Sequence, residues 1–447
     1  MQLTLAQVQS ATGAQVSTSL SQRITGWSND SRTLAPGDLY FAIRGERFDG
    51  HAFVADAFRR GAIGAVVSEP VEAQGVLFQV PDTLKALQAV AHCARRQWGR
   101  SLIAVTGSAG KTTTKEVIAA LLGTRFQVGK TIGNLNNHIG LPLTLLRMPD
   151  DAEAGVVEMG MNHAGEIRQL AAIAAPDIGV ITNVGYAHIE AFDSIEGVAA
   201  AKRELIESLP PSGTAVLNAD DERVLRFREV HRGRVITYGF SPDADVRATD
   251  AQIGSECVAF TVDGVRFESN LAGRHSISNI LAGLAVARIF ELDFHSLIDA
   301  VRALAPGKMR GQRSHWRGIT ILNDSYNSNP EAVRNMIDVL REEPAQRRIA
   351  VLGEMLELGH MAESLHRDVG AYVARAGVDV LVGVRGVSRL MVEQAKQAGL
   401  ADHAALFFDD PDAAGEFLRG FVRPGDAILF KGSRGIQVER ALATMEA

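Results

Sequence analysis

The stretch Ser101-Leu-Ile-Ala-Val-Thr-Gly-Ser-Ala-Gly-Lys-Thr-Thr-Thr-Lys-Glu116 predicts a buried strand, a glycine turn and a helix. The short apolar run at its start is typical of a central parallel strand. Gly107 and Gly110 allow a tight turn without a Cβ in the way of a ligand. From Lys111 onward, apolar residues recur at helical spacing. The turn therefore aims several backbone N–H groups at one point, at the positive end of a helix dipole.

An anion suits this turn, and the residue types favour a polyphosphate. Lys111 can place its charge against the outer phosphates, and Thr112 has the hydroxyl that usually meets Mg²⁺ in such loops. The standard phosphate loop has a glycine six residues before the lysine, whereas this chain has Val105 there. The alternative is a glycine turn with a surface lysine. The strand, the turn, the helix and the hydroxyl side chains together favour the phosphate site.

Composition limits the class of protein. The chain has 447 residues, with 46 Lys and Arg against 52 Asp and Glu, and its formal charge of −6 argues against nucleic acid as a bulk partner. It has only two cysteines, Cys93 and Cys257, which excludes a disulfide framework and fits a reducing compartment. No signal-peptide pattern and no membrane-spanning apolar run is seen, so we expect a cytoplasmic protein without membrane insertion.

The alternation of strand and helix patterns predicts an α/β protein of three domains. We expect a small N-terminal α/β domain at 1–83, a central P-loop ATPase-type α/β domain at 84–308 and a Rossmann-like C-terminal domain at 309–447. An amphipathic helix beginning near Leu84 should bridge the first two domains. The third domain should be doubly wound and mostly parallel, with strands at 319–322, 349–352, 378–382, 405–408 and 427–430. Its first helix should begin at Pro330, with Asn329 as the N-cap.

Polar residues follow two strands of the expected central sheet. Glu158 ends the strand at 154–159, and His188 follows the strand at 178–183. Ligands collect at the carboxyl ends of parallel strands, so both residues should share a rim with the phosphate loop, where they could bind Mg²⁺. A capping role for Glu158 and a hydrogen-bonded core position for His188 are the alternatives. From the residues alone, Lys202 belongs to a solvated helix face.

Three further regions are polar where a ligand could bind. The first domain has polar loops at 29–32 and 45–51, for which loop capping is as well supported as a ligand site. The third domain has polar residues just after two strands, at 323–327 and 431–435, which should face a cleft. In the central domain, Asn279 near the start of a helix could contact a base edge, although the residues alone do not decide this.

Read together, these pieces resemble the Mur ligase family, over nearly the whole chain. The matching stretches are Asp30–Gly45, Thr106–Glu116, Gly133–Thr144, Glu158–Asn162, Asn183–Glu190 and Lys431–Arg434. The stretches Asn323–Pro330 and Leu352–Gly359 point to the branch that adds D-alanyl-D-alanine. The Asp-Asn-Pro-Arg signature of the branch that adds the third peptide residue is absent. This chain has His275-Ser276 where the family usually has His-Asn, which weakens only a role for position 276.

The resemblance implies an ATP- and Mg²⁺-dependent amide ligase. It would join D-alanyl-D-alanine to UDP-N-acetylmuramoyl-tripeptide through an acyl phosphate, giving the pentapeptide precursor of peptidoglycan. It would act in the cytoplasm as a monomer. The resemblance also reverses the surface reading of Lys202, whose position matches a carbamylated lysine in this family.

The resemblance assigns residues to each ligand. The catalytic residues would be Lys111, His188 and Lys202. ATP would be bound by Gly107, Ser108, Ala109, Gly110, Lys111, Thr112, Thr113, Asn279, Arg313 and Asp324. Mg²⁺ would be held by Thr112, Glu158, His188 and, if carbamylated, Lys202. The other substrates would be bound by Ser31, Arg32, Asp49, Gly50, His51, Asn137, Tyr326, Asn327, Lys431, Ser433 and Arg434.

Three other functions compete with this one. A second ligase of the same family, such as one that adds glutamate to folate, would lack the Asn323–Pro330 stretch and this first domain. A nucleotide-binding partner of wall enzymes that has lost ligation would not need Lys111, Glu158, His188 and Lys202 together. A mechanical ATPase would be expected to have the standard phosphate loop.

Overall fold

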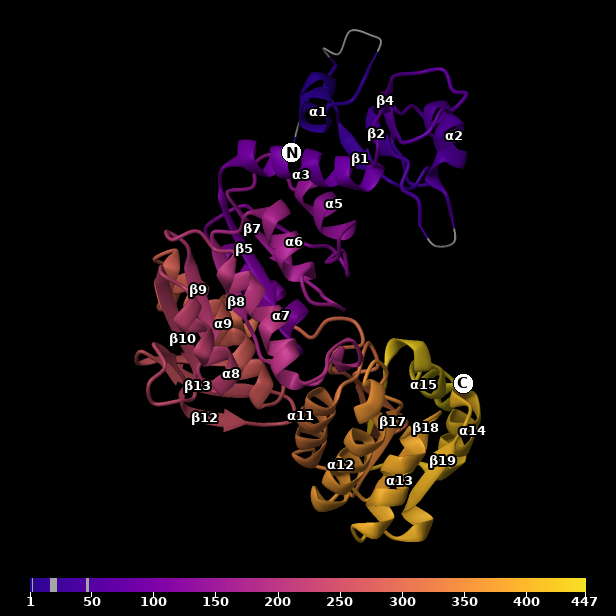
Figure 1. Cartoon of the computed structure of the whole chain (residues 1–447). Helices are drawn as coiled ribbons and strands as arrows, with labels where there is room; N and C mark the ends of the chain where they lie inside the picture. The colour runs from indigo at the N-terminus through magenta and orange to yellow at the C-terminus, as the bar shows by residue number, and fades with distance from the viewer. Residues whose placement is uncertain (2, 17–21, 46–47) are drawn as a thin grey trace.

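The computed structural model describes residues 1, 3–16, 22–45 and 48–447, and folds into three lobes, each built on its own sheet (Figure 1). The N-terminal lobe has four parallel strands in the order β1-β2-β3-β4. Its elements are α1 (Leu5–Thr12), β1 (Gly26–Ser28), β2 (Asp38–Phe41), the 3-10 helix η1 (Gly50–Phe53), α2 (Val54–Arg59), β3 (Gly64–Val67) and β4 (Leu77–Gln79).

Helix α3 (Thr83–Trp98) joins the first lobe to the central one, as its amphipathic pattern predicts. Asp82 caps its start by accepting from the backbone N–H groups of the first turn. The Thr83 hydroxyl donates to the backbone oxygen of Ala42 in the first lobe. At the other end, the Arg95 guanidinium donates to the backbone oxygen of Ala174 and the carboxylate of Asp177. The helix is therefore tied to both lobes by buried polar contacts.

The central lobe is a parallel sheet of seven strands in the order β11-β10-β9-β8-β5-β7-β6. Its strands are β5 (Ser101–Thr106), β6 (Val128–Lys130), β7 (Ala154–Glu158), β8 (Ile178–Ile181), β9 (Thr214–Asn218), β10 (Arg234–Gly239) and β11 (Val246–Arg247). Beside it lies an antiparallel sheet of β12 (Thr249–Ile253), β13 (Val258–Val262) and β14 (Val265–Ser269).

Helices cover both faces of the central sheet, because side chains of β5 point alternately to the two faces. The helices are α4 (Lys111–Leu122), α5 (Gly140–Leu146), α6 (Glu166–Ala174), α7 (Ile195–Glu207), α8 (Glu222–Leu225), α9 (Arg274–Ile289) and α10 (Ile298–Arg302). Ile103 and Val105 pack in one apolar cluster with α4 and α9, whereas Leu102 and Ala104 pack in the other with α5, α6 and α7.

The C-terminal lobe has six strands in the order β15-β16-β20-β17-β18-β19, all parallel except β15. Its strands are β15 (Gln312–Trp316), β16 (Ile319–Asn323), β17 (Arg347–Gly353), β18 (Val380–Val384), β19 (Ala405–Phe408) and β20 (Asp426–Lys431). Its helices are α11 (Pro330–Arg341), α12 (Ala362–Arg375), α13 (Ser388–Gln397), α14 (Pro411–Phe421) and α15 (Glu439–Glu446). Asn329 caps α11 with Pro330 at its first position, which confirms that prediction.

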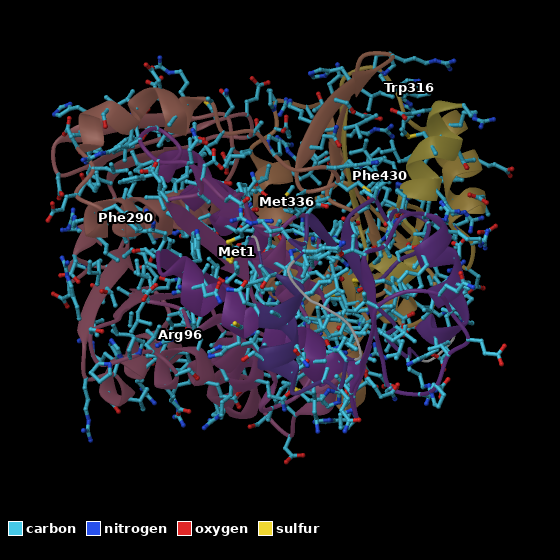
Figure 2. The ribbon with its side chains drawn as sticks, turned by 90° about the horizontal axis from the view of Figure 1, so that it is seen from above. Met1, Arg96, Phe290, Trp316, Met336 and Phe430 are labelled. Carbon is cyan, nitrogen blue, oxygen red and sulfur yellow. The ribbon has the colours of Figure 1, made fainter. Side chains whose placement is uncertain are left out.

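The sequence pattern did not predict the edge strand β15, whose residues are mostly exposed. Figure 2, seen from above, places Trp316 of β15 at the outer edge of the molecule and Met336 of α11 near its middle. Each sheet lies inside one of the three ranges expected for the domains. Within the described part of the chain, no helix combines the length and the apolar composition that crossing a membrane requires.

Candidate active site

The phosphate loop lies between the carboxyl end of β5 and the start of α4. Gly110 caps α4 with a φ of 82°, in the left-handed region that glycine tolerates. A Cβ on Gly107 would lie 1.8 Å from the Thr182 hydroxyl oxygen, and one on Gly110 would lie 2.6 Å from Asn279 Oδ1. Both glycines are therefore required by close packing as well as by backbone conformation.

The residues around the loop fix its backbone. Ser108 and Gly185 exchange two hydrogen bonds, because the Ser108 hydroxyl donates to the Gly185 oxygen and accepts from its N–H. The Ala109 N–H donates to Asn183 Oδ1 at 2.9 Å, and the Thr182 hydroxyl donates to the Ala109 oxygen at 2.6 Å. The loop is thus held by the segment after β8 before any ligand binds.

Lys111 and Glu158 provide opposite charges on this rim. The Lys111 ammonium donates to the Gly107 oxygen at 2.8 Å. Burial, and then the charge of Arg310, lowers the pKa of Lys111. Glu158 ends β7 and is buried, and its carboxylate accepts from the Thr112 hydroxyl and from Asn136 Nδ2, each at 2.8 Å. A carboxylate beside a hydroxyl and an amide is a donor set that suits a hard cation such as Mg²⁺.

His188 and Lys202 complete the central-lobe candidates. His188 has a φ of 62°, and its Nδ1 lies 2.6 Å from Oε2 of Glu357 in the C-terminal lobe. Contact with His188 is the main cause that lowers the pKa of Glu357. Lys202 lies on α7 and is 1% exposed. Burial, and then the charge of Lys111, lowers the pKa of Lys202 well below its ordinary value. The expectation that Lys202 lies on a solvated helix face is therefore wrong.

The loop opens into a cleft of about 600 Å³ between the central and C-terminal lobes. The cleft brings together most of the residues predicted to bind ATP and Mg²⁺. Those that line it are Ser108, Ala109, Gly110, Lys111, Thr112, Thr113, Glu158, His188, Asn279 and Asp324. Four of the residues predicted to bind the other substrates line it as well, namely Asn137, Tyr326, Asn327 and Lys431.

On the C-terminal side of the cleft, Lys431 ends β20 and is 2% exposed. Its ammonium donates to Asp324 Oδ2 and to the Asn327 oxygen. Of the neighbouring candidates, the Ser433 hydroxyl accepts from the Leu356 N–H at 2.9 Å, and the exposed Arg434 pairs with Glu439. Neither residue lines the cleft, so the geometry brings only Lys431 of these three to the site.

The structure separates Arg313 from the cleft and brings Arg310 into it. The Arg313 guanidinium makes two contacts with the buried carboxylate of Glu343 and a third with Glu256 at 3.0 Å. Arg310 lines the cleft and stacks over the Tyr326 ring at 3.9 Å. Sequence reasoning also missed Asn136, which contacts Glu158. The only local signal for Asn136 is its place among the amides of the quoted Gly133–Thr144 stretch.

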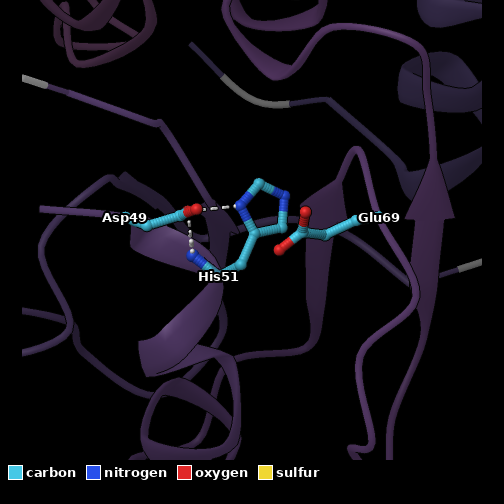
Figure 3. Close-up of side chains that lie close together, drawn as sticks. All are labelled: Asp49, His51 and Glu69. Carbon is cyan, nitrogen blue, oxygen red and sulfur yellow. Dashed lines mark hydrogen bonds and ion pairs between the residues drawn. The ribbon is translucent and has the colours of Figure 1, made fainter.

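The first-lobe candidates do not line the cleft. The Asp30 carboxylate pairs with the exposed Arg32. Asp49 caps η1, and its Oδ1 accepts from the His51 N–H at 3.0 Å and lies 2.6 Å from His51 Nδ1 (Figure 3). His51 Nε2 accepts from the Ser68 N–H at 2.9 Å. Both ring nitrogens of His51 are thus used within the lobe. Residues 46 and 47 of the candidate loop lie outside the described residues.

The remaining predicted residues have structural contacts. Gly50 has no room for a side chain, because a Cβ would lie 2.7 Å from the Ile43 nitrogen. Ser31 is buried, and the hydrogen bond between its side chain and the Asp56 carboxylate is the main cause that lowers the pKa of Asp56. Asn137 Oδ1 accepts from the Gly140 N–H at 2.9 Å, at the start of α5.

Comparison with known proteins agrees with this geometry. Residues 105–287 match the Mur ligase middle domain, residues 309–434 match the Mur ligase glutamate ligase domain, and residues 23–122 match the Mur ligase family catalytic domain. A UDP-N-acetylmuramoyl-tripeptide–D-alanyl-D-alanine ligase of a Synechocystis species is 40% identical over 93% of this chain and 90% of its own.

Two solved structures are similar over the whole fold. MurF from Acinetobacter baumannii superposes with a TM-score of 0.93 at 29% identity, covering 100% of this chain and 99% of its own. MurF ligase from Thermotoga maritima in complex with ADP has a TM-score of 0.83 at 30% identity, covering 94% of this chain and 97% of its own. By its matched domains and by these full-length relatives, the chain belongs to the Mur ligase family.

Proposed function

We propose that this chain joins D-alanyl-D-alanine to UDP-N-acetylmuramoyl-tripeptide and cleaves ATP to do so. One observation carries the proposal. The phosphate loop, the Glu158 carboxylate and the Asp324–Lys431 pair share one cleft, in a chain 40% identical to a ligase of that name. ATP as co-substrate fits a cytoplasmic reaction.

The cleft offers a place for each part of ATP. The backbone N–H groups at the start of α4 and the Lys111 ammonium would hold the phosphates. Arg310 takes the γ-phosphate role expected of Arg313, because it lines the cleft and its charge reaches Lys111. Asn279 and Asp324, which line the cleft from the central and C-terminal lobes, would contact the adenine and the ribose.

Thr112, Glu158 and His188 would hold Mg²⁺, since a hydroxyl, a carboxylate and an imidazole meet at this rim. When bound, Mg²⁺ would offset the negative charge that builds up on the phosphates. Burial and the nearby charge of Lys111 favour the neutral amine of Lys202. A neutral amine can attack CO₂ and lose a proton to give a carbamate. We therefore propose Lys202 as the carbamylated residue, which converts a neutral amine into an anion beside this rim.

The reaction requires activation of a carboxylate, because oxide is too poor a leaving group. The tripeptide carboxylate attacks the γ-phosphorus of ATP, which forms an acyl phosphate and releases ADP. The amine of D-alanyl-D-alanine then attacks the acyl carbon, loses a proton and expels inorganic phosphate. Both steps bring anions together, and Lys111 and Arg310 offset that repulsion.

The other substrates would bind around this cleft. The first lobe would hold the UDP end through Ser31, Arg32 and the loop that contains Asp49, Gly50 and His51. D-alanyl-D-alanine would bind on the C-terminal side, where Lys431 is the buried cation and Tyr326 and Asn327 line the wall. Arg434 could contribute only after its guanidinium leaves Glu439.

Phosphate release from ATP and Mg²⁺ tests the proposal directly. We expect release that requires both UDP-N-acetylmuramoyl-tripeptide and D-alanyl-D-alanine, with a pentapeptide product in the mass spectrum. ATP binding without release for this pair would contradict the substrate assignment. A folate and glutamate panel would then test the competing ligase.

A further inference from the structure

The C-terminal lobe holds the loop after β8 at three points. The Tyr186 N–H donates to Glu331 Oε1 at 3.2 Å, at the start of α11. The Glu190 N–H donates to the Glu357 backbone oxygen at 3.1 Å. Between these two contacts, His188 Nδ1 lies 2.6 Å from Glu357 Oε2. The segment that carries the proposed metal-binding histidine is therefore shaped by a different lobe.

The position of Glu357 is fixed on its own side. The Met355 N–H donates to Nε2 of the buried His366 at 3.0 Å, and the Leu356 N–H donates to the Ser433 hydroxyl. Gly359 follows with a φ of 51°, and a Cβ there would lie 3.0 Å from the Glu190 Cα. The two loops are therefore in direct backbone contact, and Glu357 reaches His188 from a well-anchored loop.

The chemistry of this contact decides which ring nitrogen of His188 can bind a ligand. Nδ1 is buried and makes no hydrogen bond of full geometry within the described chain, and the Glu357 carboxylate, with its Oε2 2.6 Å away, is the ion-pair partner found for it there. A carboxylate accepts hydrogen bonds and donates none, so it favours the proton on Nδ1 and leaves the lone pair on Nε2. Metal-binding histidines commonly have this arrangement, which fixes both the tautomer and the ring orientation.

We propose that Glu357 is a positioning residue, by which the C-terminal lobe fixes the tautomer and orientation of His188. The metal site of the central lobe is then complete only while the C-terminal lobe is docked. This inference rests on the metal-binding role given to His188 under the proposed function. It assigns to the Leu352–Gly359 stretch a task that local sequence does not reveal.

The test is Mn²⁺ binding to the full chain with a non-hydrolysable ATP analogue, followed by electron paramagnetic resonance of free Mn²⁺. The main variant is Glu357→Gln, which keeps the size of the side chain but can donate to Nδ1 and so favour the wrong tautomer. We expect Mn²⁺ affinity to fall about tenfold or more, in the range seen when such a partner is lost. Glu357→Ala should weaken binding at least as much.

Glu331→Gln is the matched control, because it makes the same chemical change at a second carboxylate of the C-terminal lobe that contacts the loop after β8. Its amide oxygen can still accept from the Tyr186 N–H, so Mn²⁺ affinity should stay within about twofold of the wild type. A purely structural contact would tolerate glutamine at both positions. Melting temperatures, measured on each variant, check that the fold is intact.

Equal Mn²⁺ affinity in the wild type and in both Glu357 variants would overturn the inference. His188→Ala separates the causes of such a result. If His188→Ala weakens Mn²⁺ binding while the Glu357 variants do not, only the positioning role is wrong. If His188→Ala has no effect either, the metal-binding role of His188 is wrong and the inference falls with it. The proposed joining of D-alanyl-D-alanine to UDP-N-acetylmuramoyl-tripeptide by the wild type would still stand, because phosphate release tests it separately.

Discussion

At the scale of single residues, the Lys111 side chain is the cation at the start of α4, in the proposed phosphate loop. Its ammonium donates to the Gly107 oxygen, a contact within the loop itself. We expect Lys111→Ala to lower turnover by at least about 100-fold, the usual cost of losing a transition-state electrostatic partner. Its melting temperature should match the wild type. Near-normal phosphate release in this variant would contradict the ATP assignment.

Lys202 provides a second residue-scale prediction, because its buried amine favours the neutral form. Lys202→Ala should lose most activity and regain part of it with acetate or another short carboxylic acid. The wild type should show a carbamate mass on Lys202 when CO₂ is preserved during measurement. An unmodified Lys202 in the wild type, together with no rescue of Lys202→Ala by carboxylic acids, would contradict the proposal that Lys202 is carbamylated.

Substitutions of Arg310 and Arg313 should have different effects on stability and activity. Arg313→Ala leaves the Glu343 carboxylate, whose side chain is 1% exposed, without its guanidinium partner. We expect a loss of about 3 kcal/mol or more in unfolding free energy, because a buried charge is left unpaired. Arg310→Ala should leave the stability unchanged and lower kcat/KM for ATP. Chemical denaturation and steady-state kinetics on both variants measure these effects. A stable Arg313→Ala with weakened kinetics for ATP, together with a destabilised Arg310→Ala, would contradict the roles given to the two residues.

At the scale of elements, the β5–α4 turn depends on the space left at Gly107. Alanine there would bring a Cβ against the Thr182 hydroxyl, at a φ of 153° that other residues avoid. Strain of about 1–3 kcal/mol in the loop should weaken ATP binding about tenfold or more. Gly420→Ala on α14 is the control, since a Cβ there meets nothing within 4 Å. Calorimetry with an ATP analogue compares them, and equal affinities would refute the packing argument.

At the scale of the whole molecule, the reactive acyl phosphate has to be kept from water. The cleft lies between two lobes, and the first and third lobes stand at opposite ends of the central one (Figure 1). We expect the C-terminal lobe to close further when ATP analogue and both other substrates are present. Small-angle scattering should show a smaller radius of gyration for the full complex than for the free chain. An unchanged radius would contradict closure.

Local patterns predicted the parts of this fold whose signals are local. The glycine turn at 107–110, the cap at Asn329 and the apolar strands of the C-terminal lobe were all found because a few adjacent residues determine them. The edge strand β15 was missed because its residues are largely exposed and leave no apolar alternation. Its antiparallel pairing with β16, which follows after Arg317 and Gly318, defines this strand, and the polarity of its side chains does not.

The site was less predictable because contacts between distant segments determine which of its residues face the cleft. Arg310 and Arg313 lie in one short cationic stretch, and the pairing of Arg313 with Glu343 decides which of them faces the cleft. Ser433 resembles an anion ligand in sequence, yet its hydroxyl is used by the Leu356 N–H. Lys202 could be placed only by resemblance, since helical position alone did not indicate its burial.

Helix α3 has a consequence for how the chain could be divided. Its apolar residues share one continuous hydrophobic cluster with Trp27 and Leu39 of the first lobe and with Leu141 and Leu170 of the central one. A cut before this helix leaves the N-terminal fragment without its covering layer, and a cut after it strips the same layer from the remainder. Either fragment would expose a broad apolar face and tend to aggregate. Dividing the chain on either side of α3 therefore costs one of these two lobes part of its core.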